Sequence, residues 1–159
     1  MTNDDSWVLL SYRLPRVPST PRAAVWRRLN RLGVIQLGDG LVALPADART
    51  REALEWVAED IVQNHGEAIV WLGKPTDKAS SATLQQRMIE LTATEYETVI
   101  SEARANRDAS TATRRRVVAR LRRELHRISD RDFFTPPQRD TARLAIEELE
   151  NETAQIRST

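Results

Sequence analysis

Two groups of arginines are the residues of this sequence whose type and spacing could do chemistry. The first group follows the apolar segment "WVLLSY" and precedes a predicted helix start, and it consists of Arg13, Arg16 and Arg22. A guanidinium group donates several hydrogen bonds in a fixed fork, and a helix N-terminus adds free backbone N–H groups. The first group is therefore typical of a site that binds an oxyanion. Ordinary surface charge is the alternative interpretation.

The second group lies in the segment "RRRVVARLRRELHR", residues 114–127. On a helix its arginines cover a broad face opposite Val117, Leu121 and Leu125, as a surface that binds DNA phosphates requires. The alternative is a solvated face, partly neutralised by the acidic segment "EELENE". Arginine outnumbers lysine 22 to 2, so clustering carries this prediction rather than residue type. The predicted DNA-binding residues are Arg114, Arg115, Arg116, Arg120, Arg122, Arg123 and Arg127.

The sequence contains none of the catalytic motifs that we looked for. A metal-dependent nuclease needs paired carboxylates, but Arg13 stands at the end of the first predicted strand and the next acid is Asp39. With no cysteine, thiol chemistry and disulfides are excluded, and no glycine-rich phosphate loop or G-x-S-x-G motif is present. We expect no catalysis, metal or cofactor. The acidic start "MTNDDSW" and the lack of a long apolar run favour a cytoplasmic protein.

The elements that must position these arginines alternate in type along the first half of the chain. Apolar runs predict strands at residues 7–12 and 67–73 and a hairpin around "GDG", residues 38–40. Amphipathic helices are predicted at residues 20–32, with Pro21 in the first turn, and at residues 50–66. This order is that of the ferredoxin-like split βαβ arrangement. We therefore expect an α+β domain over residues 6–74.

The predicted sheet has a surplus of apolar side chains. The strand segments "WVLL" and "IVWL" are apolar at odd and at even positions, so they place apolar side chains on both faces of the sheet. Both faces must then be covered by other parts of the protein. The C-terminal helices or a second subunit could supply it, and we expect a homodimer. The tryptophans lie on apolar runs and are predicted to be core residues: Trp7, Trp26, Trp56 and Trp71.

The second half of the chain is predicted to be a helical arm, residues 84–159. The polar segment "PTDKASSAT", residues 75–83, is typical of a linker. Helices are predicted at residues 94–106, where Thr94 would be the N-cap, at 113–128 and at 137–156. A segment that begins with Leu84, Met88 and Leu91 could instead form a short fifth strand.

Several long segments resemble a known family. The stretches "WVLLSYRLPRVPSTPRAAVWRRLNRLGVIQLGDGLVALP", "WVAEDIVQNHGEA", "ELTATEYETVISEA" and "RISDRDFFTPPQ" are similar to the N-terminal region of the ChrB family of chromate-resistance proteins. The likeness covers most of residues 6–150, and no motif in it is catalytic. The repressors related to the phenylacetate regulator PaaX look like more distant relatives.

The resemblance implies a cytoplasmic regulator of chromate-inducible resistance that contacts DNA and an oxyanion. Longer family members carry a separate C-terminal domain, whereas this chain stops at Thr159. The expected partners are DNA, chromate, and either a second copy or a separate chain with that missing domain. A non-DNA adaptor acting through the open sheet face and the helical arm is the alternative, because no helix-turn-helix signature stands out. An enzyme acting on chromate is disfavoured, since it would have no electron source.

Overall fold

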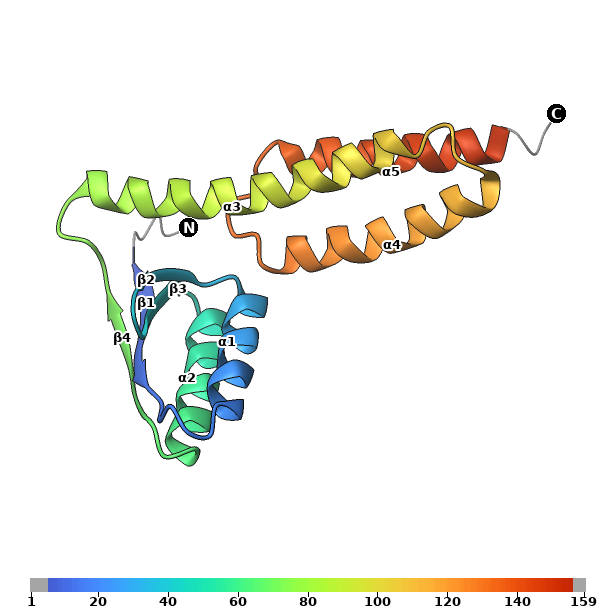
Figure 1. The fold of residues 1–159 in the computed structure, drawn as a ribbon. Coiled ribbons are helices and arrows are strands. Elements are labelled where there is room, and N and C mark those ends of the chain that lie inside the picture. Colours follow the sequence, from blue (N-terminus) through green and yellow to red (C-terminus); the bar gives the residue numbers. More distant parts are fainter. Residues whose placement is uncertain (1–5, 156–159) are drawn as a thin grey trace. The chain divides into compact units, whose positions relative to one another are not determined.

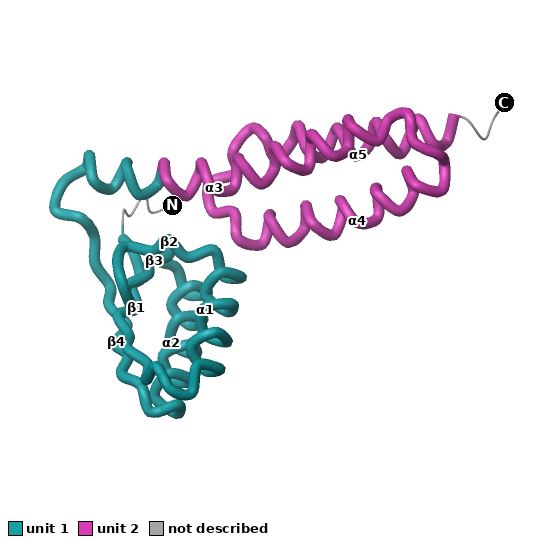
Figure 2. Tube along the Cα trace, viewed as in Figure 1, with its two compact units in different colours: residues 1–85 teal, residues 86–159 magenta. Residues whose placement is uncertain are grey.

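The structure is a computed structural model that describes residues 6–155, in two compact units that divide between Gln85 and Gln86 (Figure 2). The end of the arm predicted for residues 84–159 lies outside the described residues. The elements in chain order are β1 (Trp7–Arg13), α1 (Thr20–Leu32), β2 (Ile35–Gly38), β3 (Leu41–Pro45), α2 (Ala48–Gln63), β4 (Glu67–Gly73), α3 (Lys78–Ala105), α4 (Thr111–Asp130) and α5 (Gln138–Gln155).

The first unit contains a four-stranded sheet in the order β2-β3-β1-β4, with every neighbouring pair antiparallel. β1 is central and pairs with β4 along its whole length, from Trp7 opposite Gly73 to Arg13 opposite Glu67. Helices α1 and α2 lie together on one face of the sheet (Figure 1). This is the predicted ferredoxin-like α+β arrangement, which is confirmed.

The core of the first unit lies between the sheet and its two helices. Alternate strand residues point to the same face, so each strand sends every second apolar side chain to the helices. The helices pack apolar residues, spaced three or four positions apart in the sequence, against these strand side chains. The buried residues of this layer are Val8, Leu10, Val42, Leu44, Val25, Leu29, Leu54, Val57 and Ile61.

Local sequence explains where the two helices begin and end. Pro21 lies in the first turn of α1, where a missing N–H costs no hydrogen bond, and Gly33 ends that helix with a φ of 82°. Asp47 and Thr50 form a capping box at the start of α2, because the Thr50 N–H donates to Asp47 Oδ1 at 2.7 Å and the Asp47 N–H donates to Thr50 Oγ1 at 3.0 Å.

The second unit has its own helical core, made by α3, α4 and α5. Tyr96 is completely buried in it and donates a hydrogen bond from its hydroxyl to Asp132 Oδ2 at 2.7 Å. The predicted inward stripe of α4 is present, with Val117 and Leu121 buried. On α5, Leu144 is 48% exposed, whereas Ile146 and Leu149 are buried.

The helical arm begins earlier than the sequence indicates. Helix α3 runs without interruption from Lys78 to Ala105, so it covers most of the segment predicted as a linker, and Thr94 lies in its interior rather than at an N-cap. Asp77 stands at the start instead, where its carboxylate accepts hydrogen bonds from the Ser80 N–H at 2.7 Å and the Ser80 hydroxyl at 2.9 Å. These bonds lower the pKa of Asp77, and no proline or glycine follows to stop the helix. The alternative fifth strand does not form.

Three of the four tryptophans are not core residues, which corrects the prediction. Trp7 is buried at 3% exposure, but Trp26, Trp56 and Trp71 are 40%, 54% and 50% exposed. An apolar run in the sequence does not reveal which face of a strand, or which side of a helix, is covered by the rest of the fold. These exposed rings are therefore candidates for binding rather than packing.

A glycine at the tip of the β2–β3 hairpin is required by the backbone. Gly40 has a φ of +68°, and a Cβ there would lie 2.3 Å from the Tyr12 carbonyl oxygen. We predict that Gly40→Ala lowers the free energy of unfolding by roughly 1–3 kcal/mol, as measured by urea denaturation. Gly38→Ala is the matched control, because a Cβ there would have nothing within 4 Å apart from Gly38 itself and its two chain neighbours. Equal stabilities of the two variants would contradict this prediction.

The buried Tyr96 predicts a dependence of stability on alkaline pH. Burial raises the pKa of Tyr96 to about 12, above the value of about 10 that it has in an unfolded chain. The folded state therefore binds the phenolic proton more tightly, and this stabilisation is complete below pH 10 and is lost as the pH rises towards 12.

We predict that the free energy of unfolding of the parent protein falls more steeply between pH 10 and 12 than that of Tyr96→Phe. At pH 7 the variant should be destabilised by roughly 1.5–3 kcal/mol, because it lacks the hydrogen bond to the Asp132 carboxylate. Urea denaturation across this pH range measures both effects. Parallel pH profiles for the two proteins would show that Tyr96 does not contribute.

Candidate functional site

The arginines at the end of the first strand meet around one pocket. Arg13 ends β1, Arg16 lies in the loop that follows, and Arg22 lies in the first turn of α1. All three line a pocket of about 810 Å³. Leu14, which is 8% exposed, anchors the chain between them in the core. The sequence therefore named three arginines that the fold brings together.

The other side of the pocket comes from the β2–β3 hairpin. The Tyr12 N–H donates to the Gly40 carbonyl at 2.8 Å, which holds the hairpin tip against β1 and places Asp39 and Gln36 in the lining. Trp26 completes it from the second turn of α1. Sequence reasoning missed Tyr12, Trp26, Gln36 and Asp39. Only Trp26 carried a signal, because it follows Arg22 by four residues and so lies on the same face of the helix.

The arginines of this pocket form no ion pairs within the part of the chain that the structure describes. All three are exposed, and none forms an ion pair with a carboxylate among residues 6–155. By contrast, Arg28 on the same helix is paired with Asp60. Burial raises the pKa of Tyr12, although the nearby Arg22 opposes this rise. Its hydroxyl is therefore a neutral hydrogen-bond donor at physiological pH.

The second arginine group is distributed differently from the prediction. Arg114 is only 4% exposed, and its guanidinium donates to Thr153 Oγ1 at 3.2 Å and to the Arg107 carbonyl at 2.9 Å. Its side chain joins α4 to α5 inside the second unit. It therefore offers no donor to a DNA phosphate in this conformation.

Acidic side chains neutralise three further arginines of α4. Arg120 pairs with Glu102 at 2.6 Å, Arg122 pairs with Glu150, and Arg127 pairs with Glu124 at 3.4 Å. Arg116 donates to the Thr113 hydroxyl at 3.3 Å, which leaves its charge uncompensated. Within the described part of the chain, Arg115, Arg116 and Arg123 are the predicted DNA contacts that lack both burial and an ion pair. At 100° per residue they fall within an arc of about 100° on the helix.

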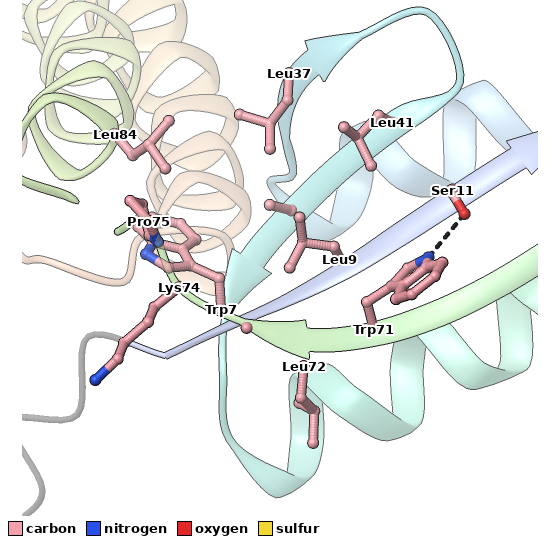
Figure 3. A pocket seen from close by; sticks show the side chains of 12 residues that line it. Trp7, Leu9, Ser11, Leu37, Leu41, Trp71, Leu72, Lys74, Pro75 and Leu84 are labelled. Carbon is pink, nitrogen blue, oxygen red and sulfur yellow. Dashed lines mark hydrogen bonds between the residues drawn. The ribbon is translucent and has the colours of Figure 1, made fainter. Parts of the chain in front are cut away.

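The open face of the sheet forms an apolar pocket of about 580 Å³ in the first unit (Figure 3). Leu9, Leu37, Leu41 and Trp71 point towards the same side, while Leu72 points to the opposite side of β4. The Trp71 indole N–H donates to Ser11 Oγ at 2.8 Å, which satisfies both polar groups. The one charged residue in the lining is Lys74.

The described residues give no sign of a metal centre or a membrane span. No three histidine, cysteine or acidic side chains gather as metal ligands among residues 6–155. None of the helices in that range has the length and apolar character needed to cross a bilayer.

Comparison with known proteins agrees with the resemblance seen in the sequence. The family described as "Protein ChrB, N-terminal" matches residues 22–157, a range that includes Arg22, Trp26 and all of α4. Protein ChrB of Cupriavidus metallidurans is 29% identical over 148 residues, which cover 91% of this chain. The chain spans 44% of the length of that relative. Since the family match extends over well more than half of the chain, this protein belongs to the ChrB N-terminal family.

Proposed function

We propose that this protein is a cytoplasmic regulator of chromate-inducible resistance that binds an oxyanion in the arginine pocket and associates with DNA. Membership of the ChrB N-terminal family supports a role connected with chromate resistance. The observation that carries the ligand proposal is the convergence of Arg13, Arg16 and Arg22 on one pocket without carboxylate partners among the described residues.

The chemistry of the pocket suits a tetrahedral dianion. Guanidinium forks donate paired hydrogen bonds to oxyanions, and such charge-assisted bonds are stronger than neutral ones. Arg22 lies in the first turn of α1, where the helix dipole also favours negative charge. The neutral Tyr12 hydroxyl adds a donor without adding charge. The pocket therefore binds chromate by charge and hydrogen bonding, with no covalent step.

The protein acts in this proposal as a sensor and not as a catalyst. Reduction of chromate requires an electron donor, and the sequence contains no cysteine. The pocket lining also lacks a histidine or a pair of carboxylates that could act as acid and base. Binding of the anion, rather than its conversion, is the function that the side chains support.

DNA association is assigned to the exposed part of α4. Arg115, Arg116 and Arg123 share one side of the helix and carry charge that no acidic side chain of the described residues neutralises. Phosphate contacts of this type give affinity without sequence specificity. The operator would be selected by other parts of the assembly, such as a second copy or another chain.

A second candidate function is that of an adaptor, favoured by the exposed apolar residues on the open sheet face. Ile69 and Trp71 are 54% and 50% exposed there. The lining carries one lysine and no carboxylate, so it suits an equally apolar surface better than a charged ligand. A second copy presents that surface by two-fold symmetry.

The oxyanion proposal predicts selective loss of chromate binding. Arg13→Ala/Arg22→Ala should weaken binding about tenfold or more, because two charge-assisted donors are removed. Arg27→Ala is the control, since that arginine is exposed on α1 outside the pocket lining. Equilibrium dialysis measures the affinity of both variants for chromate. If the double variant and the control bind chromate equally, the anion site lies elsewhere.

The DNA proposal predicts a shallow salt dependence. With three available arginines, the logarithm of the affinity should fall with the logarithm of salt concentration at a slope of roughly −3. Arg115→Ala/Arg123→Ala should reduce the slope to about −1, whereas Arg122→Ala should leave it unchanged because Glu150 already pairs that arginine. Fluorescence anisotropy with DNA from upstream of the gene provides the measurement. An unchanged slope in the double variant would exclude this face and favour the adaptor.

A further inference from the structure

The arginine pocket is larger than an inorganic oxyanion requires. Its volume of about 810 Å³ falls in the range of clefts that hold organic ligands, roughly 300–1,000 Å³. A tetrahedral ion of five atoms would occupy only the space next to the guanidinium groups. The remaining lining then has no ligand atoms to contact, although it contains side chains with distinct binding chemistry.

Trp26 is the first of these side chains. It is a tryptophan of the pocket lining with 40% of its surface exposed, and it lies one turn of α1 beyond Arg22. The face of an indole ring stacks on a planar base, and such stacking operates in many proteins that bind nucleotides. An inorganic anion gains nothing from an aromatic face, which carries negative electrostatic potential.

Asp39 is the second side chain of the lining with a binding chemistry of its own. Its exposed carboxylate lines the same pocket and forms no ion pair within residues 6–155. A carboxylate repels a bare dianion, but it accepts hydrogen bonds from hydroxyl and amino groups. An acidic residue beside a phosphate site has this role towards ribose hydroxyls in dinucleotide-binding folds. The lining thus combines cationic donors, an acceptor and an aromatic face.

We propose that the arginine pocket is a binding site for a nucleoside monophosphate. The phosphate lies among Arg13, Arg16 and Arg22, the base stacks on Trp26, and a ribose hydroxyl donates to Asp39. This inference rests on the proposed anion site and extends it, because chromate and the nucleotide phosphate compete for the same arginines. A single free nucleotide fits better than a strand, since the Asp39 carboxylate opposes a second phosphate.

The test compares adenosine 5′-monophosphate, inorganic phosphate and chromate by isothermal titration calorimetry on the full chain. We expect the nucleotide to bind at least tenfold more tightly than phosphate. Trp26→Ala should weaken nucleotide binding about tenfold, as loss of a stacked base does, and should leave chromate binding unchanged. Trp56→Ala is the matched control, because Trp56 is also an exposed tryptophan but lies outside this pocket.

Asp39→Asn should change the affinities for the nucleotide and for chromate in opposite directions. It should weaken nucleotide binding severalfold through loss of a ribose contact, and it should strengthen chromate binding because a repelling charge is removed. Circular dichroism of each variant reports whether the fold is intact. We expect an intact fold, because the side chains of Trp26 and Asp39 are both exposed.

Three results would overturn the inference. Phosphate and nucleotide could bind equally, Trp26→Ala could change both ligands equally, or a single-stranded oligonucleotide could bind more than tenfold more tightly than the mononucleotide. In the first two cases the chromate site stands and the nucleotide does not. If Arg13→Ala/Arg22→Ala leaves the binding of both ligands intact, the anion site itself is refuted, which is a different outcome.

Discussion

The candidate site depends on a backbone constraint at the end of β1. A Cβ at Gly40 would lie 2.3 Å from the Tyr12 carbonyl oxygen, and a Cβ at Gly66 would lie 2.5 Å from that of Arg13. Two glycines thus let neighbouring chain segments approach the last residues of β1 closely, and the hydrogen bond from the Tyr12 N–H to Gly40 closes one side. The main chain at Arg13 is fixed by these contacts, while its side chain remains exposed. A backbone held by such contacts and carrying exposed guanidinium groups is a suitable frame for an anion site, because less backbone entropy is lost on binding.

Much of the first unit could be predicted from the sequence because local patterns specify it. The alternation of strand and helix signals predicted the ferredoxin-like order, and the three arginines singled out around a helix start line one pocket. Asp39 and Tyr12 could not be assigned, since their role follows from the approach of the hairpin tip to β1, a contact between residues far apart in the chain. Arg114 illustrates a signal that was present but not used. It lies three, four and seven residues before Val117, Val118 and Leu121, and so belongs to the buried stripe of α4.

The two arginine groups show how acidic neighbours decide the role of one residue type. The carboxylates of Glu102, Glu150 and Glu124 compensate three guanidinium groups of α4. Ion pairs of this kind on a surface add little stability, but they remove much of the positive field that would attract a polyanion. Around the arginine pocket no such pairing occurs within the described residues. A count of arginines in the sequence overstates the charge of α4 and understates the difference between the two surfaces.

Exposed guanidinium groups also limit how tightly the pocket can hold a small ion. Interactions between exposed charges are screened by physiological salt, and sulfate or phosphate offers the same charge and nearly the same shape as chromate. Charge alone therefore supplies attraction but little discrimination. Discrimination requires contacts that depend on shape or on donor and acceptor pattern, because an unmatched polar group then carries a desolvation cost. In this pocket the Tyr12 hydroxyl could make such a contact with an inorganic ion, whereas the Trp26 ring and the Asp39 carboxylate could make such contacts only with a larger ligand such as the proposed nucleotide. In the proposed function, selectivity is therefore determined by the residues around the arginines, and the arginines favour an anionic ligand.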